Sequence, residues 1–121
     1  MPSEIQAQMD FWFEQNLGFR YRQGAIFVTG DLDIARQYAG DHGEVRTLQP
    51  TGPFHFCWGR QSNDLYGEYV DMRANESVTE LLQRLEFQCG DLAGALDSGN
   101  EIMLVGAAFQ AAVLKKASNT G

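Results

Sequence analysis

The chain has 121 residues, of which 44% are apolar and 12% aromatic, and its formal net charge is −7 at pH 7. This length and composition are typical of one folded domain and exclude a disordered protein, because enough apolar surface is available to form a buried core. The acidic balance argues against a nucleic-acid binder, which needs clustered Lys and Arg to contact phosphates. No apolar run approaches the ~20 residues that a membrane-spanning helix needs, so we expect no membrane partner.

The first part of the chain predicts a helix followed by a strand. Ser3 begins the helix, apolar residues recur in it at helical spacing, and Gly18 ends it. Residues 19–22 alternate in character, as in a short extended segment, and the apolar residues 25–29 are typical of a core strand.

A short helix and two strands are expected next. Asp31 is the predicted N-cap of the helix, and Gly40 ends it. Residues 45–48 predict a short strand. After a Gly-Pro turn, residues 54–58 predict a second strand with its aromatic side chains on one face.

The second half of the chain predicts short helices and two final strands. Residues 62–73 have a weak helical pattern, Ser77 opens a capping box ahead of a helix, and residues 91–96 predict another helix. Residues 101–105 and 109–114 are expected to be strands that pair with each other as a hairpin. The first of these strands is apolar without a break after its leading Glu, as in a strand covered on both faces.

The order of these elements predicts an α+β fold, a small single domain with a mixed or antiparallel sheet and short helices. Residues 1–116 are expected to form this domain and residues 117–121 a polar tail that frays. The two cysteines form no CxxC motif, and no signal-peptide pattern stands at the start, so we expect free thiols in a reducing cytoplasm. If the protein is encoded by a virus, the expected compartment is the cytoplasm of the host cell.

Two segments of the chain resemble ADP-ribosyltransferase domains. Residues 24–31, Gly-Ala-Ile-Phe-Val-Thr-Gly-Asp, followed by Ala35 and the pair Tyr38-Ala39, are similar to a central strand and helix of that family, in which the strand ends in Ser or Thr. Residues 100–104, Asn-Glu-Ile-Met-Leu, are similar to the strand that begins with the family's catalytic glutamate. The whole chain also resembles small phage-encoded proteins.

The resemblance implies an enzyme that moves ADP-ribose from NAD to a macromolecular target. Glu101 would then be the catalytic residue, which hydrogen-bonds the nicotinamide ribose and stabilises the positive charge that develops as nicotinamide leaves. Thr29 would support Glu101, and Tyr38 or Tyr21 would stack on the nicotinamide.

The chain departs from that family in two respects. The family opens with a strand whose Arg or His grips NAD, and this chain has no room for such a strand before its first helix. Arg20 and Arg22 are both close to Thr29 in the sequence for this role, and Arg22 is the predicted cofactor-binding cation. The acid that precedes the catalytic glutamate by two residues in many arginine-modifying members is Gly99 here.

A second interpretation is a small acidic inhibitor, of phage type or immunity type, that occupies a basic surface of a partner protein. The net charge and the missing NAD-gripping residue favour this interpretation over the enzyme. The strand aromatics Phe54, Phe56 and Trp58 could line the interface, since aromatic residues such as Trp and Tyr dominate interface hot spots. The alternative is that these three residues pack in the core. The residues expected to contact the partner are Asp64, Tyr66, Glu68, Tyr69 and Asp71.

No metal site is predicted. His55 and Cys57 share one face of a predicted strand, and His42 with Cys89 would complete four ligands, but this spacing fits no zinc finger. A Cys57 nucleophile with His55 as its base is equally unsupported, because no orienting group is evident.

Overall fold

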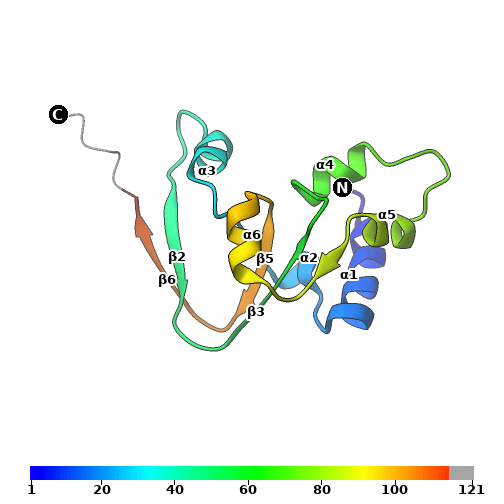
Figure 1. Cartoon of the computed structure of the whole chain (residues 1–121), viewed down its shortest axis with the longest axis horizontal. Coiled ribbons are helices and arrows are strands. Elements are labelled where there is room, and N and C mark those ends of the chain that lie inside the picture. The colour runs from blue at the N-terminus through cyan, green and yellow to red at the C-terminus, as the bar shows by residue number, and fades with distance from the viewer. Residues whose placement is uncertain (115–121) are drawn as a thin grey trace.

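The computed structural model describes residues 1–114, which form an α+β fold, as the sequence predicts (Figure 1). The last two residues of the predicted domain and the predicted tail, 117–121, lie outside the described residues. Within residues 1–114, no helix combines the length and the apolar character required to cross a membrane. The helices are α1 (Ser3–Leu17), α2 (Tyr21–Gly24), α3 (Leu32–Ala39), α4 (Leu65–Val70), α5 (Val78–Arg84) and α6 (Leu92–Ser98). The strands are β1 (Ile26–Val28), β2 (Arg46–Pro50), β3 (Phe54–Gly59), β4 (Phe87–Gln88), β5 (Ile102–Gly106) and β6 (Phe109–Val113).

The strands form two antiparallel sheets. A four-stranded sheet has the order β1-β5-β3-β4, and β2 pairs with β6 in a separate two-stranded sheet. The predicted hairpin between the last two strands is therefore wrong. Both edges of β5 are already paired, with β1 and with β3, so the chain that leaves β5 follows β2 instead.

One long pair of antiparallel segments joins the two sheets. Pro50 pairs with Phe109 and Phe54 pairs with Gly106, so three residues of one segment oppose two residues of the other. The Thr51 N–H donates to the carbonyl of Ala108 at 3.1 Å within this interruption. An extra residue on one side bends an antiparallel pair, and the β2–β6 pair accordingly leans away from the four-stranded sheet on the side opposite α1 and α5 (Figure 1).

Hydrophobic side chains cover both faces of the four-stranded sheet. Alternate residues of β3 and β5 belong to two clusters: Cys57 and Met103 face α1, α2 and α5, whereas Trp58 and Ile102 face α6. This confirms the prediction of a strand covered on both faces after Glu101. The larger cluster contains the buried residues Met9, Phe13, Tyr21, Cys57, Leu65, Val78, Leu81, Leu82, Leu85 and Met103.

Helices that carry a capping signal in the sequence begin where that signal predicts. The Asp31 side chain accepts a hydrogen bond from the Ile34 N–H at 3.0 Å, and Ser77 forms both bonds of its capping box with Glu80. The first helix ends at Gly18, which is left-handed with φ 89°, although no side chain caps its start at Ser3.

Two local predictions differ from the structure, and one strand is not predicted. Residues 19–22 are not extended, because α2 begins at Tyr21. Strand β1 is shorter than predicted and lies at the edge of its sheet, so Ile26 and Phe27 are exposed rather than in the core. Strand β4 is not predicted, since two residues carry no periodicity and their pairing with Trp58 and Gly59 is non-local.

Candidate functional site

A cleft of about 670 Å³ lies between β2 and the part of the four-stranded sheet next to α3. Its lining residues come from β1 and the loop after it, from α3, from residues 44–48 and from the loop before β5. Four large side chains at the cleft are substantially exposed, namely Phe27, Leu32, Tyr38 and Leu96. A concave site of this volume with a mostly apolar lining and a few polar groups is typical of small-molecule binding.

The pairing of β1 with β5 brings Thr29 and Glu101 to one end of the sheet. Val28 pairs with Ile102, so Thr29 and Glu101 are the next residues in this register, and both line the cleft. The Thr29 hydroxyl donates to the carbonyl of Gly99 at 3.0 Å and accepts from the Asp31 N–H at 3.2 Å. Thr29 therefore fixes the loop that carries Glu101, rather than the carboxylate itself.

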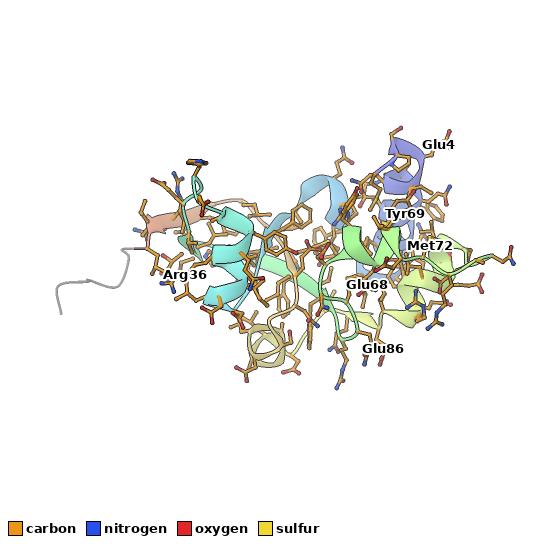
Figure 2. The ribbon with its side chains drawn as sticks, turned by 90° about the horizontal axis from the view of Figure 1, so that it is seen from above. Glu4, Arg36, Glu68, Tyr69, Met72 and Glu86 are labelled. Atoms are coloured by element: carbon orange, nitrogen blue, oxygen red, sulfur yellow. The ribbon has the colours of Figure 1, made fainter. Side chains whose placement is uncertain are left out.

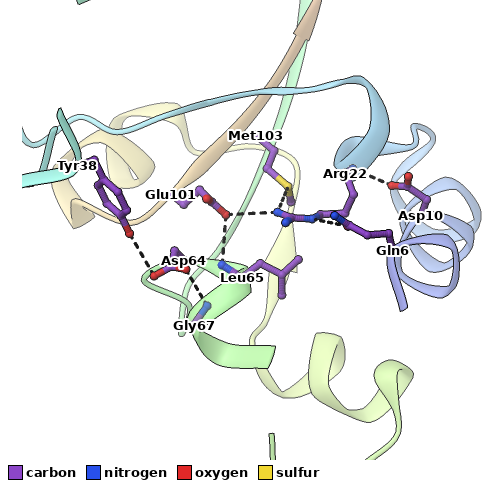
Figure 3. Close-up of polar contacts among 9 residues, drawn as sticks. All are labelled: Gln6, Asp10, Arg22, Tyr38, Asp64, Leu65, Gly67, Glu101 and Met103. Atoms are coloured by element: carbon purple, nitrogen blue, oxygen red, sulfur yellow. Dashed lines mark hydrogen bonds and ion pairs between the residues drawn. The ribbon is translucent and has the colours of Figure 1, made fainter. Parts of the chain in front are cut away.

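The Glu101 carboxylate is largely buried, with 23% of its side chain exposed. One oxygen, Oε1, accepts the Leu65 N–H at 3.2 Å and lies 3.8 Å from Arg22 Nη1 (Figure 3). Burial raises the pKa of Glu101, nearby Asp64 adds to this effect, and the Leu65 N–H and the Arg22 charge oppose it. A carboxyl group with a raised pKa in a cleft is characteristic of functional sites.

Asn100 positions the loop before α4 against Glu101. Its buried side-chain amide donates to the carbonyls of Gly59 at 3.0 Å and Arg60 at 3.3 Å. The Glu101 N–H also donates to the carbonyl of Asn63 at 2.8 Å. Asn100 is not among the predicted site residues. Its position directly before Glu101 is the available signal in the sequence, because Asn favours turns and can hydrogen-bond backbone groups.

Tyr38 extends from α3 along the cleft, and 72% of it is exposed. Its hydroxyl donates to Asp64 Oδ2 at 3.2 Å, while Asp64 Oδ1 caps α4 by accepting the Gly67 N–H at 2.7 Å (Figure 3). Burial and the negative charge of Asp64 raise the pKa of the Tyr38 hydroxyl, so it stays protonated and remains a donor at neutral pH. Tyr38, Thr29 and Glu101 thus line one cleft.

The other two predicted cofactor-binding residues, Tyr21 and Arg22, do not line the cleft. Tyr21 is buried against Phe13, with ring centroids 6.0 Å apart, and its hydroxyl lies 3.8 Å from Cys89 Sγ. Burial raises the pKa of Tyr21 strongly. Arg22 approaches Glu101 from α2, on the side away from Tyr38 (Figure 3).

The residues predicted to bind a partner lie on and beside α4, but not all of them face outward. Tyr69 packs against the larger hydrophobic cluster (Figure 2), and the Asp64 carboxylate is engaged by Gly67 and Tyr38. Tyr66 is 53% exposed, Asp71 is exposed and Glu68 is half-buried. The exposed surface that these five residues form in the structure is therefore smaller than the sequence predicts.

The strand aromatics and the cysteines occupy different environments. Trp58 is buried and its indole N–H donates to the carbonyl of Gly90 at 2.8 Å, so for this residue the core interpretation is correct. Phe56 is partly buried beside it, and Phe54 is exposed. His55 stacks on Phe19, and within the part of the chain that the structure describes, no three His, Cys, Asp or Glu side chains are grouped as a metal site.

No protein-family model, curated protein or solved structure matches the chain. The geometry of the cleft is therefore the basis for assigning a function.

Proposed function

We propose that the cleft binds NAD and that the protein transfers ADP-ribose from NAD to a macromolecular acceptor, with Glu101 as the catalytic carboxylate. One observation carries this proposal: Thr29, Tyr38 and Glu101, which come from β1, α3 and the start of β5, line the same cleft. These are the residues to which the sequence resemblance assigns support, stacking and catalysis.

The surroundings of Glu101 suit this chemistry. In the reaction the bond between the nicotinamide nitrogen and the ribose carbon breaks, and its electron pair leaves with nicotinamide. Positive charge develops on the ribose until a nucleophilic atom of the acceptor forms a bond to the same carbon and releases its proton to water. A carboxylate that is fixed before the reaction stabilises this charge without reorganisation. The Leu65 N–H fixes Glu101 by a hydrogen bond, and the hydrogen bond from the Thr29 hydroxyl to the Gly99 carbonyl fixes the loop before Glu101.

The cleft also contains groups that fit the rest of the dinucleotide. Tyr38 offers an exposed aromatic ring for stacking. Arg46, which lines the cleft from β2, is 61% exposed and pairs with Glu44 at 3.1 Å, so its guanidinium is accessible to a diphosphate. Arg46 supplies a cation to the cleft that is not among the predicted site residues.

Label transfer tests this proposal directly. The wild type, Glu101→Gln and the matched control Glu4→Gln, which changes an exposed glutamate of α1, are incubated with cell extract and NAD labelled in the adenylate. We expect labelled macromolecules with the wild type and the control, and at least a ~100-fold loss with Glu101→Gln, as is usual when a main electrostatic group is removed. Absence of transfer and of nicotinamide release with the wild type would overturn the proposal.

A second candidate function follows from the exposed side of α4. We propose as this alternative that the protein inhibits a partner, as a phage-type or immunity-type protein, by occupying a basic surface. Tyr66 and Val70 are exposed large residues on one short helix, and Asp71 directly follows them. An aromatic anchor with an acidic rim suits a basic partner.

The α4 surface is tested by comparing two double variants in pull-downs from the native host extract. Tyr66→Ala with Asp71→Lys changes the proposed contact surface, and Leu92→Ala with Asp97→Lys makes a similar change on α6. We expect a basic protein retained by the wild type and the α6 variant to be lost by the α4 variant. Equal retention by all three proteins would remove this surface from consideration.

A further inference from the structure

We propose that Arg22 is the positioning residue of Glu101 and that α1 holds Arg22 in place for this purpose. This inference rests on the proposed function and deepens it, because it assigns Arg22 to the catalytic carboxylate rather than to the dinucleotide.

The backbone of Arg22 is anchored by a buried acid of α1. Asp10, which is 4% exposed, accepts the Arg22 N–H at 2.7 Å through Oδ1 and the Gln23 N–H at 3.0 Å through Oδ2. These two N–H groups belong to the first turn of α2, which has no side-chain cap of its own. The carboxylate of one helix therefore caps the next helix with two charge-assisted hydrogen bonds.

The side chain of Arg22 is held equally firmly and is 9% exposed. Its Nε donates to Gln6 Oε1 at 3.1 Å, Nη1 lies 3.9 Å from Met103 Sδ, and Cζ lies 4.9 Å from the centroid of the Phe27 ring. A guanidinium over an aromatic face at this distance makes a favourable cation–π contact. Arg22 thus has side-chain partners on α1 and β5, which Figure 3 shows, and a further partner on β1.

The side-chain contacts of Glu101 are made through one of its two oxygens. Arg22 Nη1 and the Leu65 N–H both approach Oε1, and within residues 1–114 no hydrogen bond is made to Oε2. This arrangement fixes one oxygen against the protein and leaves the other available to a ribose hydroxyl.

The charges around Glu101 make Arg22 important for its ionisation. The titratable groups that interact electrostatically with Glu101 are Arg22 from α2, Asp64 from the loop before α4, the Tyr38 hydroxyl from α3 and the Cys57 thiol from β3. Asp64 repels the charged form of Glu101, and burial raises the pKa of Cys57 so that this thiol stays neutral. Arg22 is the cation of this group and opposes the effect of burial on the carboxylate.

The test is an NMR titration of the Glu101 side-chain carboxyl in the free protein. We expect Arg22→Gln to raise the pKa of Glu101 by about one unit or more, a tenfold change in proton affinity. Arg22→Lys should restore part of the difference. The matched control is Arg20→Gln, which removes an exposed arginine that pairs with Glu14 at 2.9 Å and should leave the titration unchanged. An unchanged titration in Arg22→Gln would overturn the inference.

A second variant keeps the inference testable if Arg22→Gln does not fold. Gln6→Met removes the acceptor of Arg22 Nε but retains the charge and the volume of the site. We expect the pKa of Glu101 to rise in the same direction by a smaller amount, because Arg22 is less firmly held. No shift in this folded variant would contradict the role of α1.

Kinetics separate positioning from cofactor binding. With NAD as substrate, Arg22→Gln should lower kcat while the KM for NAD stays within about threefold, because the group acts on Glu101. A large rise in KM with unchanged kcat would assign Arg22 to the dinucleotide instead. The titration needs no turnover, so failure of the proposed function and failure of this inference give different results.

Discussion

At the scale of single residues, Glu101 combines an unfavourable environment with a position at the cleft. Its carboxylate is largely removed from water and lies near Asp64, and burial raises its pKa. The Leu65 N–H and Arg22 reduce this cost without removing it. Functional sites commonly carry such locally unfavourable groups, and replacing them often stabilises the protein.

Glu101→Gln should therefore unfold less readily than the wild type at neutral pH. Because the pKa is higher in the folded protein, folding favours the protonated acid, so the wild type loses stability as the pH rises above the ordinary value of 4.5. Gln resembles the protonated acid and can still accept the Leu65 N–H. Urea unfolding at pH 7 and at pH 4 measures the difference, which should shrink at the lower pH.

A matched variant identifies the source of this effect. Glu4→Gln changes an exposed glutamate and should alter the free energy of unfolding by less than about 0.5 kcal/mol at either pH. A Glu101→Gln variant that is less stable than the wild type at pH 7 would contradict the account of its burial.

The sequence identifies part of the site, because Thr29 and Glu101 lie at the ends of short apolar strands. It cannot identify the Leu65 N–H or Gln6 as partners. These contacts join residues 36 and 16 positions apart, and they depend on how the elements pack. Asn100 is likewise recognisable only once its contacts with the Gly59 and Arg60 carbonyls are known.

At the scale of elements, α2 exists because α1 caps it. A four-residue helix is not stable by itself in water, since nucleation is unfavourable. Asp10 satisfies two N–H groups of its first turn, and Tyr21 is buried in the core beside them. The sequence predicts an extended segment here because four residues are too few to show helical periodicity.

Asp10→Asn should destabilise the protein by about 2–3 kcal/mol, because one backbone N–H then faces an amide donor instead of a carboxylate oxygen. Urea unfolding measures this change. Glu14→Gln, which alters an exposed ion pair on the same helix, should cost less than about 1 kcal/mol. Similar losses for the two variants would contradict the capping role of Asp10.

The ion pair between Glu76, which precedes α5, and Arg84, the last residue of α5, predicts a distinct response to acid. Two hydrogen bonds of 2.8 Å from Arg84 lower the pKa of Glu76 to about 2. Because this pKa is lower in the folded protein, the ion pair contributes stability above the ordinary value of 4.5 and loses it as the pH falls from there toward 2.

Glu76→Gln should remove that part of the pH dependence. Thermal unfolding between pH 5 and pH 2 should show a shallower decline for the variant than for the wild type. Glu80→Gln, which retains an acceptor for the Ser77 N–H, should follow the wild type. Parallel declines for Glu76→Gln and the wild type would contradict the ion pair's contribution.

The sequence predicts elements with local signals better than it predicts the pairing of strands. The capping box at Ser77 and the cap at Asp31 are local signals, and both are confirmed. Strand partners are determined by non-local packing, so the partner of the last strand is predicted wrongly and β4 is not predicted at all.

At the scale of the whole molecule, the bend between the two sheets creates the cleft. The β2–β6 pair leaves the four-stranded sheet beyond the pair of Phe54 and Gly106 (Figure 1). Residues of β2 then form one wall of the cleft. The opposite wall depends on close packing of the loop after β1 against α6. A Cβ atom on Gly30 would collide with the carbonyl oxygen of Leu96.

Gly30→Ala should destabilise the protein by about 1–3 kcal/mol, because backbone atoms must move apart to admit the methyl group. Ligand binding in the cleft should weaken in the same variant. Gly24→Ala, where a Cβ would have no neighbour within 4 Å, is the matched control for the unfolding measurement. Equal stability of the two variants would contradict the close approach of α6.

Binding of NAD in the cleft around Glu101, as we propose, can be measured by NMR titration of the wild type with NAD. We expect saturable shifts of the Thr29, Tyr38 and Glu101 backbone amides, with weaker binding in Tyr38→Ala. Amide signals that remain unchanged at millimolar NAD, or that shift only on the α4 surface around Tyr66, would contradict the account.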